Sequence, residues 1–168
     1  MQTDVQREYV EYVSARLTAL RRLAYLLCGD EHRADDLVQQ AITKLYVQWR
    51  RISLVEHLDQ YVRTMVVRAF LDERRRPWSR VGLTNALPER ASPDHHLEES
   101  MVLRAALAQV PRRQQAVLVL RFLCDLPVDE VASVLNCSTG TVKSQTSRGL
   151  ANLRRLLEDQ DIPVGKGS

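Results

Sequence analysis

The chain has 168 residues, enough for one domain or two small ones, and its 45% hydrophobic and 27% charged residues are typical of a folded globular protein rather than a disordered one. Its longest apolar runs, such as residues 23–28, are far too short to span a membrane, and its polar, acidic start lacks the pattern of a signal peptide, so we expect a cytoplasmic protein without membrane insertion. The net charge of +3 is small, so the distribution of charge is more informative than its sum.

Two helices are predicted in the first 51 residues. Apolar residues recur every three or four positions over residues 5–28 and again over 30–51, which is the spacing of a helix with one buried face. Between them, Cys28-Gly29-Asp30 is suited to end the first helix and to cap the second.

A patch of acids and amides lies near the start of the second predicted helix. Its residues are Asp35, Asp36, Gln39 and Gln40. Negative side chains at a helix start complement the helix dipole, and on spacing alone this structural interpretation is favoured over a binding surface.

An arginine-rich helix is predicted over residues 60–75, after a loop at 52–59. Its inner stripe consists of Val62, Met65, Val66, Ala69 and Phe70, which leaves Arg63, Arg68, Arg74 and Arg75 largely outside. Asp72 and Glu73 are the only acids in this stretch, so its positive face favours nucleic-acid contact over an ordinary solvated surface. Pro77 is predicted to end the helix, because the residue before a proline disfavours helical backbone.

The second half of the chain is predicted to be a separate helical domain. Residues 77–96 are rich in turn-forming residues and show no apolar period, which indicates a flexible linker. A fourth helix is predicted from Leu97, and a fifth, opened by Pro111, has apolar positions at Val117, Leu120, Phe122 and Leu123. No segment alternates polar and apolar residues as a strand would. The sequence therefore predicts an all-α protein of two small helical domains joined by a Pro-containing linker.

The last predicted element is a helix-turn-helix at residues 126–157. Pro127 suits the first position of a helix, and Asn136 tolerates the left-handed backbone that ends one. Ser138 or Thr139 is expected to cap the second helix. The inner stripe of that helix is predicted to consist of Val142, Leu150, Leu153 and Leu157.

The outer face of this final helix carries polar and basic side chains. They are Lys143, Ser144, Gln145, Ser147 and Arg148, and residues 141–157 include no acid. Such side chains reach phosphates and base edges in the DNA major groove, which favours a DNA-binding helix-turn-helix. The alternative is an ordinary helical hairpin with a solvated basic face. It explains the apolar stripe equally well, but not a polar cluster without acids.

The cysteine and histidine patterns argue against a disulfide framework and against a metal site. Cys28, Cys124 and Cys137 are far apart in the sequence and form no CxxC pair, and the four histidines lack metal-ligand spacing to them. No Ser-His-Asp, paired-carboxylate or phosphate-loop pattern indicates an enzyme. We therefore expect no catalytic residue, no cofactor and no metal, and we expect each cysteine to be a small buried hydrophobe.

Four sequence blocks carry a resemblance to a known family. They are DDLVQQAITKLYVQW (35–49), YVRTMVVRAFLDERRR (61–76), VPRRQQAVLVLRF (110–122) and VDEVASVLNCSTGTVKSQTSRGLANLR (128–154). In this order, with a Pro-containing spacer, they resemble the bacterial RNA polymerase sigma factors of the sigma-70 family, extracytoplasmic-function group, over nearly the whole chain. The stretch RLAYLLCGDEHRADDLVQQ is similar to the actinobacterial branch of that group.

The resemblance implies a promoter-specificity subunit with two DNA-binding domains. Residues 1–76 would bind the polymerase core and the −10 element, 77–96 would be the linker, 97–160 would bind the −35 element, and 161–168 would be a disordered tail. The implied partners are promoter DNA and core RNA polymerase, through the clamp helices of its largest subunit and the flap of its β-subunit. Members of the group are commonly silenced by an anti-sigma factor, which is a further expected partner. The alternative is a stand-alone helix-turn-helix regulator that does not dock on polymerase.

The resemblance also assigns roles to individual residues. Asp35, Asp36, Gln39 and Gln40 become a polymerase-binding surface in place of the structural interpretation. The loop with Ser53 and Leu54 is expected to capture a flipped base of the −10 element, which is held by the helix bearing Arg63, Arg68, Arg74, Arg75 and Arg76. The −35 contacts are expected from Thr139, Thr141, Lys143, Ser144, Gln145, Ser147 and Arg148. Family members often carry Asn at the position of Arg68 and a basic residue at that of Gln145, so no relative's promoter sequence is transferred to this chain.

Overall fold

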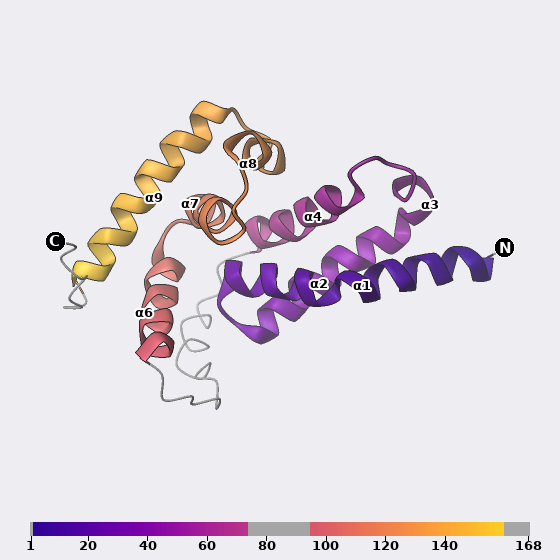
Figure 1. Ribbon diagram of the computed structural model, residues 1–168, viewed down its shortest axis with the longest axis horizontal. Coiled ribbons are helices and arrows are strands. Elements are labelled where there is room, and N and C mark those ends of the chain that lie inside the picture. The colour runs from indigo at the N-terminus through magenta and orange to yellow at the C-terminus, as the bar shows by residue number, and fades with distance from the viewer. Residues whose placement is uncertain (1, 74–94, 160–168) are drawn as a thin grey trace. The chain divides into compact units, whose positions relative to one another are not determined.

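The computed structural model describes the backbone of residues 2–73 and 95–159, and the side chains of 3–73 and 101–159. The chain divides into two compact units, residues 1–74 and 75–168, and each is described by itself. Every regular element in the described ranges is helical (Figure 1), which confirms the predicted all-α class. None of the described helices is long and apolar enough to cross a membrane.

The described residues of the first unit, 2–73, form three long helices and one short one. They are α1 (Gln2–Cys28), α2 (Glu31–Val47), α3 (Trp49–Ile52) and α4 (Leu58–Asp72). The helices α1, α2 and α4 pack against one another (Figure 1), and their fully buried side chains include Leu27, Leu37, Leu45, Val66 and Phe70. The predicted second helix is thus two helices, because the backbone at Gln48 leaves helical geometry between α2 and α3.

The corner between α1 and α2 forms as the sequence predicts. Gly29 takes a left-handed φ of 73°, a conformation that glycine adopts without steric cost, and its N–H donates to the Tyr25 carbonyl over 2.8 Å. The Asp30 carboxylate then accepts hydrogen bonds from the backbone N–H groups of His32 and Arg33, at 2.8 and 3.3 Å. Asp30 therefore satisfies two of the free N–H groups at the start of α2.

The helix α4 ends earlier than predicted. It stops at Asp72, and Glu73 has extended backbone with ψ of 123°, whereas the sequence placed the end near Arg75 with Pro77 as the cause. The physical reason is an ion pair between Arg33 of α2 and Glu73, both of whose side chains are about four-fifths buried. Pro77 and the predicted linker lie outside the described residues.

The described residues of the second unit form four α-helices and one π-helical turn. They are α6 (His95–Gln109), α7 (Arg112–Leu118), η1 (Val119–Leu123), α8 (Val128–Leu135) and α9 (Thr139–Asp159). The long helix α9 contacts α6, α7 and α8 (Figure 1), and the buried core of the unit includes Val110, Val117, Leu120, Val131 and Val142. The core of this unit therefore holds α9 in place against three other helices.

The π-helical turn η1 changes which apolar residues face the core. In it the Cys124 N–H donates to the Val119 carbonyl over 2.9 Å, one residue farther back than in an α-helix. Leu120 is buried, but Phe122 is 52% exposed and Leu123 is 49% exposed. Two apolar positions of the predicted fifth helix therefore lie at the surface.

Candidate nucleic-acid interface

The helix-turn-helix consists of α8, a three-residue turn and α9. Asn136 takes the predicted left-handed conformation, with φ of 53° and ψ of 52°, and the next N–H, that of Cys137, donates to the Ala132 carbonyl over 3.0 Å. The prediction that Pro127 is the first helical residue is wrong. Pro127 is the N-cap, one position before the helix, because its ψ of 159° is extended. The missing proline N–H still leaves no helical hydrogen bond unmade, because an N-cap N–H has no partner within the helix.

The start of α9 is capped by Ser138, one of the two predicted caps. Its hydroxyl oxygen accepts a hydrogen bond from the Thr141 N–H over 3.0 Å and lies 2.9 Å from the Thr141 hydroxyl. The Thr141 hydroxyl is therefore engaged in the cap, and Thr141 is half-buried. Thr139, two residues earlier, is exposed and free to contact a ligand.

The inner face of α9 differs from the predicted stripe. Val142 is buried as predicted, but Leu150 is 39% exposed, and the buried position beside it is Gly149. A Cβ atom at Gly149 would lie 3.1 Å from Cδ1 of Leu118, so the missing side chain allows α7 and α9 to approach closely. About one turn farther along, the Asn152 side-chain amide donates a hydrogen bond to Gln114 of α7 over 2.7 Å, which continues this face.

The position of Gln145 follows from the shift of the buried face of α9 from Leu150 to Gly149. Gln145 is half-buried, and its side-chain oxygen is inaccessible to solvent without a hydrogen-bond partner among the described residues. The expectation that it points outward beside its neighbours is therefore wrong. Its role in reading DNA stays a prediction, and the buried oxygen leaves the amide nitrogen as the atom that would reach a base.

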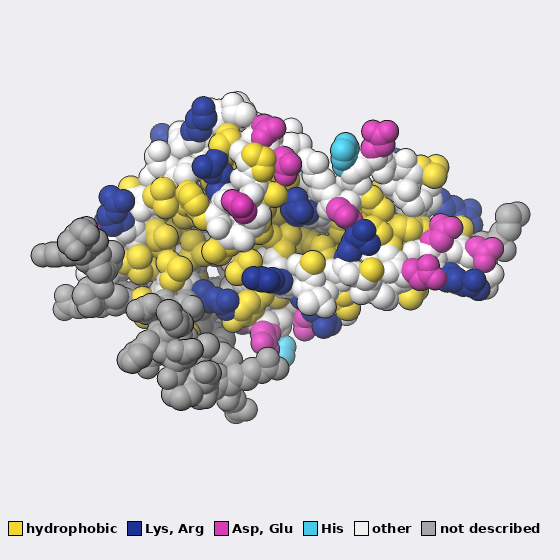
Figure 2. All heavy atoms as spheres, in the orientation of Figure 1, with side chains coloured by type: hydrophobic (Ala, Val, Ile, Leu, Met, Phe, Trp, Pro, Cys, Tyr) yellow, Lys and Arg dark blue, Asp and Glu magenta, His cyan; other side chains and the backbone are white. Residues whose placement is uncertain are grey.

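The outer face of α9 presents the remaining predicted residues. Lys143, Ser144, Ser147 and Arg148 are all exposed. Their spacing of three and four residues places them on adjacent turns of one surface. Within the part of the chain that the structure describes, neither Lys143 nor Arg148 has an ion-pair partner. On the face drawn in Figure 2, basic side chains lie along α9, while acidic ones gather over α8.

The loop before α4 exposes apolar side chains. Leu54 is 85% exposed and Val55 is 46% exposed, whereas Ser53 is half-buried and its N–H donates to the Trp49 carbonyl over 2.8 Å. The loop ends at His57, which has a left-handed φ of 65°. Such exposed apolar residues cost solvation free energy, and they are suited to contact an apolar surface such as an unstacked base.

The predicted arginines of α4 are only partly described. Arg63 is half-buried and Arg68 is exposed. Arg74, Arg75 and Arg76 lie outside the described residues.

A hydrogen-bond network that the sequence did not reveal fixes the first turn of α4. The Tyr12 hydroxyl and the Arg16 guanidinium, both on α1, donate to the carboxylate of Asp59, the former over 2.5 Å. These two hydrogen bonds, that of Tyr12 first, lower the pKa of Asp59. Burial and the contact with Asp59 raise the pKa of Tyr12. The partners are more than 40 residues apart in the chain, so no local pattern could have indicated the network.

The acid and amide patch lies on the exposed side of α2. Asp35 forms an ion pair with Arg21 of α1, in which Nε and Oδ1 are 3.3 Å apart, and both side chains are more than half exposed. Asp36, Gln39 and Gln40 are also exposed, and with Thr43 and Lys44 they line a shallow open groove. A surface of this kind is available for contact with another protein.

Comparisons with known proteins match both units. The family model "Sigma-70 region 2" matches residues 12–80, and "Sigma-70, region 4" matches residues 100–153. An RNA polymerase sigma-E factor of Streptomyces avermitilis is 33% identical over 162 residues, which cover 92% of this chain and 88% of that protein. The corresponding factor of Streptomyces coelicolor is 31% identical, with 92% and 89% covered. The extracytoplasmic-function sigma factor SigW of Bacillus subtilis is 23% identical over 172 residues, with 92% and 91% covered.

Solved structures share the fold. The sigma factor RpoE, in its complex with the anti-sigma factor NepR from Bartonella quintana, matches with a TM-score of 0.65 and 21% identity over 90% of this chain and 98% of that one. CnrH, in its complex with the cytosolic domain of CnrY, matches with a TM-score of 0.63 and 20% identity over 92% and 90%. At these identities the likeness shows a common arrangement of helices within each unit.

Proposed function

The chain belongs to the sigma-70 family, in its extracytoplasmic-function group, and we propose that its two units act together as the promoter-specificity subunit of RNA polymerase. The observation that carries this function is the order of the matches: a region 2 on residues 12–80 and a region 4 on 100–153 of one chain. The first unit would bind the core polymerase and the −10 element. The second unit would bind the −35 element through α9.

The −35 contacts are proposed to come from the exposed face of α9. Lys143 and Arg148, which have no ion-pair partner among the described residues, would direct their positive charge toward phosphates or guanine edges, and the hydroxyls of Ser144 and Ser147 would supply short hydrogen bonds between them. Thr139 lies at the positive end of the α9 dipole, where backbone N–H groups favour a phosphate. Thr141 and Gln145 would contribute less to these contacts, because the Thr141 hydroxyl is engaged in the cap and the Gln145 side-chain oxygen is buried.

The −10 contacts are proposed to come from the loop before α4 and from α4 itself. Extruding a base from the duplex costs a few kcal/mol of lost stacking, which contacts in a pocket and along the backbone must offset. Leu54 and Ser53 lie in the loop that would receive the base. Arg63 and Arg68, with Arg74, Arg75 and Arg76 farther along the chain, would contact the phosphates. The network on Asp59 supports this proposal, because it fixes the first turn of α4 beside the loop.

The polymerase contact is proposed at the acid and amide patch of α2. Asp36, Gln39 and Gln40 are exposed along one groove, and Asp35 is only partly engaged by Arg21. These residues would dock on the clamp helices of the largest subunit, and the second unit would contact the flap of the β-subunit. An anti-sigma factor would silence the chain by covering these surfaces. The matched RpoE structure is a complex with the anti-sigma factor NepR, and the matched CnrH structure is a complex with the cytosolic domain of CnrY.

Three further properties follow from the same proposal. Members of this family are transcription initiation factors, and the chemistry of RNA synthesis belongs to the polymerase, so we propose that this chain is not an enzyme. Its work with polymerase and DNA would place it in the cytoplasm. Residues 77–96 would act as a flexible connection between the units.

Run-off transcription from a randomised promoter pool tests the function. Purified chain is mixed with bacterial core polymerase and a pool of linear duplexes whose upstream region is random, and the transcribed templates are sequenced. We expect enrichment of two short motifs at a fixed spacing. The control reaction contains core polymerase alone, which should enrich no motif.

A stand-alone regulator would behave differently in the same material. It would bind duplexes from the pool tightly without polymerase, select a palindrome, and leave transcript yield unchanged when core polymerase is added. That combination would refute the role as a promoter-specificity subunit.

A further inference from the structure

The loop at residues 53–57 is held mainly by the helices at its two ends. Ser53 is half-buried, but residues 54–57 are all exposed, so their side chains add little packing against the unit. At its start, the Val55 N–H donates to the Ile52 carbonyl over 2.9 Å, which joins the loop to α3. The conformation of the loop therefore depends on where α3 ends and where α4 begins.

One side chain of α1, that of Tyr12, contacts both of these helices. Its ring lies 5.5 Å from the ring of Trp49, the first residue of α3. Its hydroxyl donates to the carboxylate of Asp59, the second residue of α4, over 2.5 Å. Tyr12 thus links the helix that leads into the loop to the helix that follows it.

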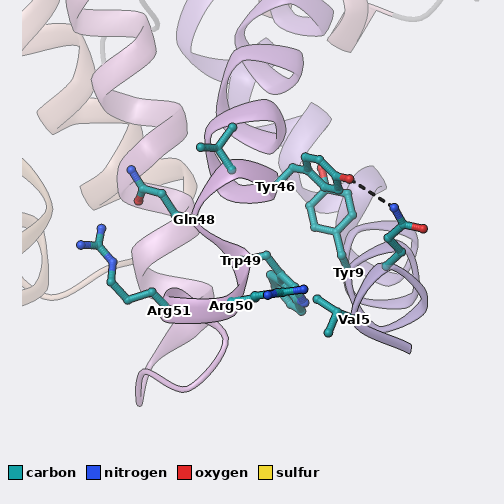
Figure 3. A pocket seen from close by; sticks show the side chains of 9 residues that line it. Val5, Tyr9, Tyr46, Gln48, Trp49, Arg50 and Arg51 are labelled. Carbon is teal, nitrogen blue, oxygen red and sulfur yellow. Dashed lines mark hydrogen bonds between the residues drawn. The ribbon is translucent and has the colours of Figure 1, made fainter. Parts of the chain in front are cut away.

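The contact with α3 is made to a side chain that is itself fixed. Trp49 is 5% exposed and lies against two tyrosines of α1, with its ring 5.6 Å from that of Tyr9. Trp49 also lines the aromatic pocket, a cavity of about 630 Å³ between residues 5–9 and 46–51. Figure 3 shows Tyr9 and Tyr46 side by side in the wall of this pocket, with Trp49 beneath them. The ring of Tyr12 therefore packs on a rigid surface.

The contact with α4 is polar and lies near the solvent. Arg16, one turn after Tyr12, places its guanidinium 4.2 Å from the centre of the Tyr12 ring and donates to both carboxylate oxygens of Asp59, the second over 3.4 Å. The side chains of Arg16 and Asp59 are 39% and 60% exposed, and exposed ion pairs contribute little to stability. The main effect of this contact is therefore on the direction of α4 rather than on the stability of the unit.

We propose that Tyr12 is a positioning residue for capture of the −10 base. Its ring and its hydroxyl together fix the separation of α3 and α4, and this separation holds the loop in the conformation that receives the base. The inference rests on the proposed function, because the base is the ligand proposed there for the loop. Without the hydroxyl, the loop would adopt several conformations, and its apparent affinity for the base would fall with the fraction that is competent to bind.

Binding to a pre-melted promoter tests the role of Tyr12. Holoenzyme, formed from the full chain and core polymerase, is titrated onto a fluorescent promoter from the transcribed pool that carries a fixed bubble over the −10 motif. Each non-template base of the motif is replaced in turn by an abasic site. For the wild type, removal of the captured base should weaken binding about tenfold, within the usual range for one stacked base.

Tyr12→Phe keeps the ring and removes only the hydroxyl. It should bind the intact bubble about fivefold more weakly than the wild type, the usual effect of losing one hydrogen bond. On the bubble that lacks the captured base it should bind as the wild type does, because the loop then has nothing to receive. Its affinity for core polymerase, measured without DNA, should be unchanged. General damage to the first unit would instead weaken all three interactions.

A matched control removes a hydroxyl from the same helix. The ring of Tyr9 also contacts Trp49, but its hydroxyl donates to the Ile42 carbonyl of α2 over 2.6 Å and not to α4. Tyr9→Phe should therefore keep the wild-type abasic profile. Asp59→Ala removes the acceptor and should weaken binding to the intact bubble at least as much as Tyr12→Phe. The double variant of Tyr12→Phe and Asp59→Ala should be no weaker than Asp59→Ala alone, because both changes remove the same hydrogen bond.

Three results would overturn the role of Tyr12. One is wild-type affinity of Tyr12→Phe for the intact bubble, and another is an equal loss on the intact and abasic bubbles. The third is loss of core-polymerase affinity in Tyr12→Phe, which would assign the hydroxyl to polymerase docking. If removal of no base weakens binding of the wild type, the proposed capture by the loop is itself refuted. A wild-type profile that Tyr12→Phe leaves unchanged would refute only the role of Tyr12.

Discussion

Adding one methyl group at Gly149 should weaken the second unit, although alanine normally strengthens a helix. In a helix interior, Gly→Ala contributes about 1 kcal/mol of stability. At Gly149 the new Cβ would lie 3.1 and 3.2 Å from Cδ1 and Cγ of Leu118, and 3.4 Å from Cβ of Gln114. Carbon atoms prefer separations of about 3.5–4.0 Å, so α7 and α9 must move apart or Leu118 must leave its rotamer.

The magnitude follows from these two opposing effects. Overpacking a well-filled site costs about 1–3 kcal/mol, which exceeds or cancels the gain in helix propensity. We therefore expect Gly149→Ala to change the free energy of unfolding by about 0 to −2 kcal/mol. Gly140→Ala is the matched control on the same helix, because its Cβ would meet only the Ser138 hydroxyl at 3.8 Å. That variant should be neutral or more stable by up to about 1 kcal/mol.

The assay must report on the second unit alone. Trp49 belongs to the first unit and Trp78 lies outside the described residues, so tryptophan fluorescence is not a direct probe of α7 and α9. Amide hydrogen exchange, measured by mass spectrometry on peptides from α7 and α9, gives the local opening free energy directly. A difference of about 1–3 kcal/mol between the two alanine variants corresponds to roughly 5- to 150-fold faster exchange in Gly149→Ala.

One result would refute the prediction for Gly149. If Gly149→Ala exchanges as slowly as Gly140→Ala at the α7 and α9 peptides, the close approach of these helices is not tight. In that case Gly149 would no longer explain why Leu150 lies outside the buried face of α9.

Three further predictions concern the two proposed interfaces and the first unit. Arg148→Ala should weaken binding of a −35 duplex by about 1–3 kcal/mol if Arg148 reads a base, with Arg154→Ala, on another face of α9, as control; a loss that is uniform across all duplex sequences would instead assign Arg148 to phosphate. Asp36→Lys should lower affinity for core polymerase in a fluorescence titration, while Glu11→Lys should not, and unchanged affinity would return the α2 patch to a structural role. The pKa of Asp59 is lower in the folded state than its unfolded value of about 4, so its contribution to stability is present above about pH 4 and is lost as the pH falls through the lowered pKa. Thermal melting of the first unit from pH 6 to pH 3 should therefore drop more steeply for the wild type than for Asp59→Asn, and parallel curves would contradict the assignment.

The features that the sequence predicts well are those set by local chemistry. The cap at Asp30, the left-handed turn at Asn136 and the cap at Ser138 each depend on a few adjacent residues, and all three form as expected. The resemblance to sigma factors is likewise confirmed, because its blocks are continuous stretches of sequence.

The features that it predicts poorly depend on residues distant in the chain. The end of α4 at Asp72 is set by Arg33, forty residues earlier than Glu73. The half-burial of Gln145 and the exposure of Leu150 follow from the close approach of α9 to α7. The spacing of the leucines in the sequence does not indicate this approach. The aromatic pocket joins residues 5–9 to residues 46–51, and only the packing of α1 on α2 brings them together.

The π-helical turn η1 has a consequence for the angular setting of the helix-turn-helix. Its hydrogen bond from Cys124 to Val119 takes one extra residue into a single turn. Each residue of a helix turns the chain by about 100°, so everything after the turn is shifted in phase by that angle relative to an uninterrupted α7. The direction in which the chain enters α8 is thus set by the number of residues between Val119 and Leu123. Deletion of one residue there would restore the α-helical phase and rotate α8 and α9 about the axis of α7. A substitution would leave the direction of α8 and α9 unchanged.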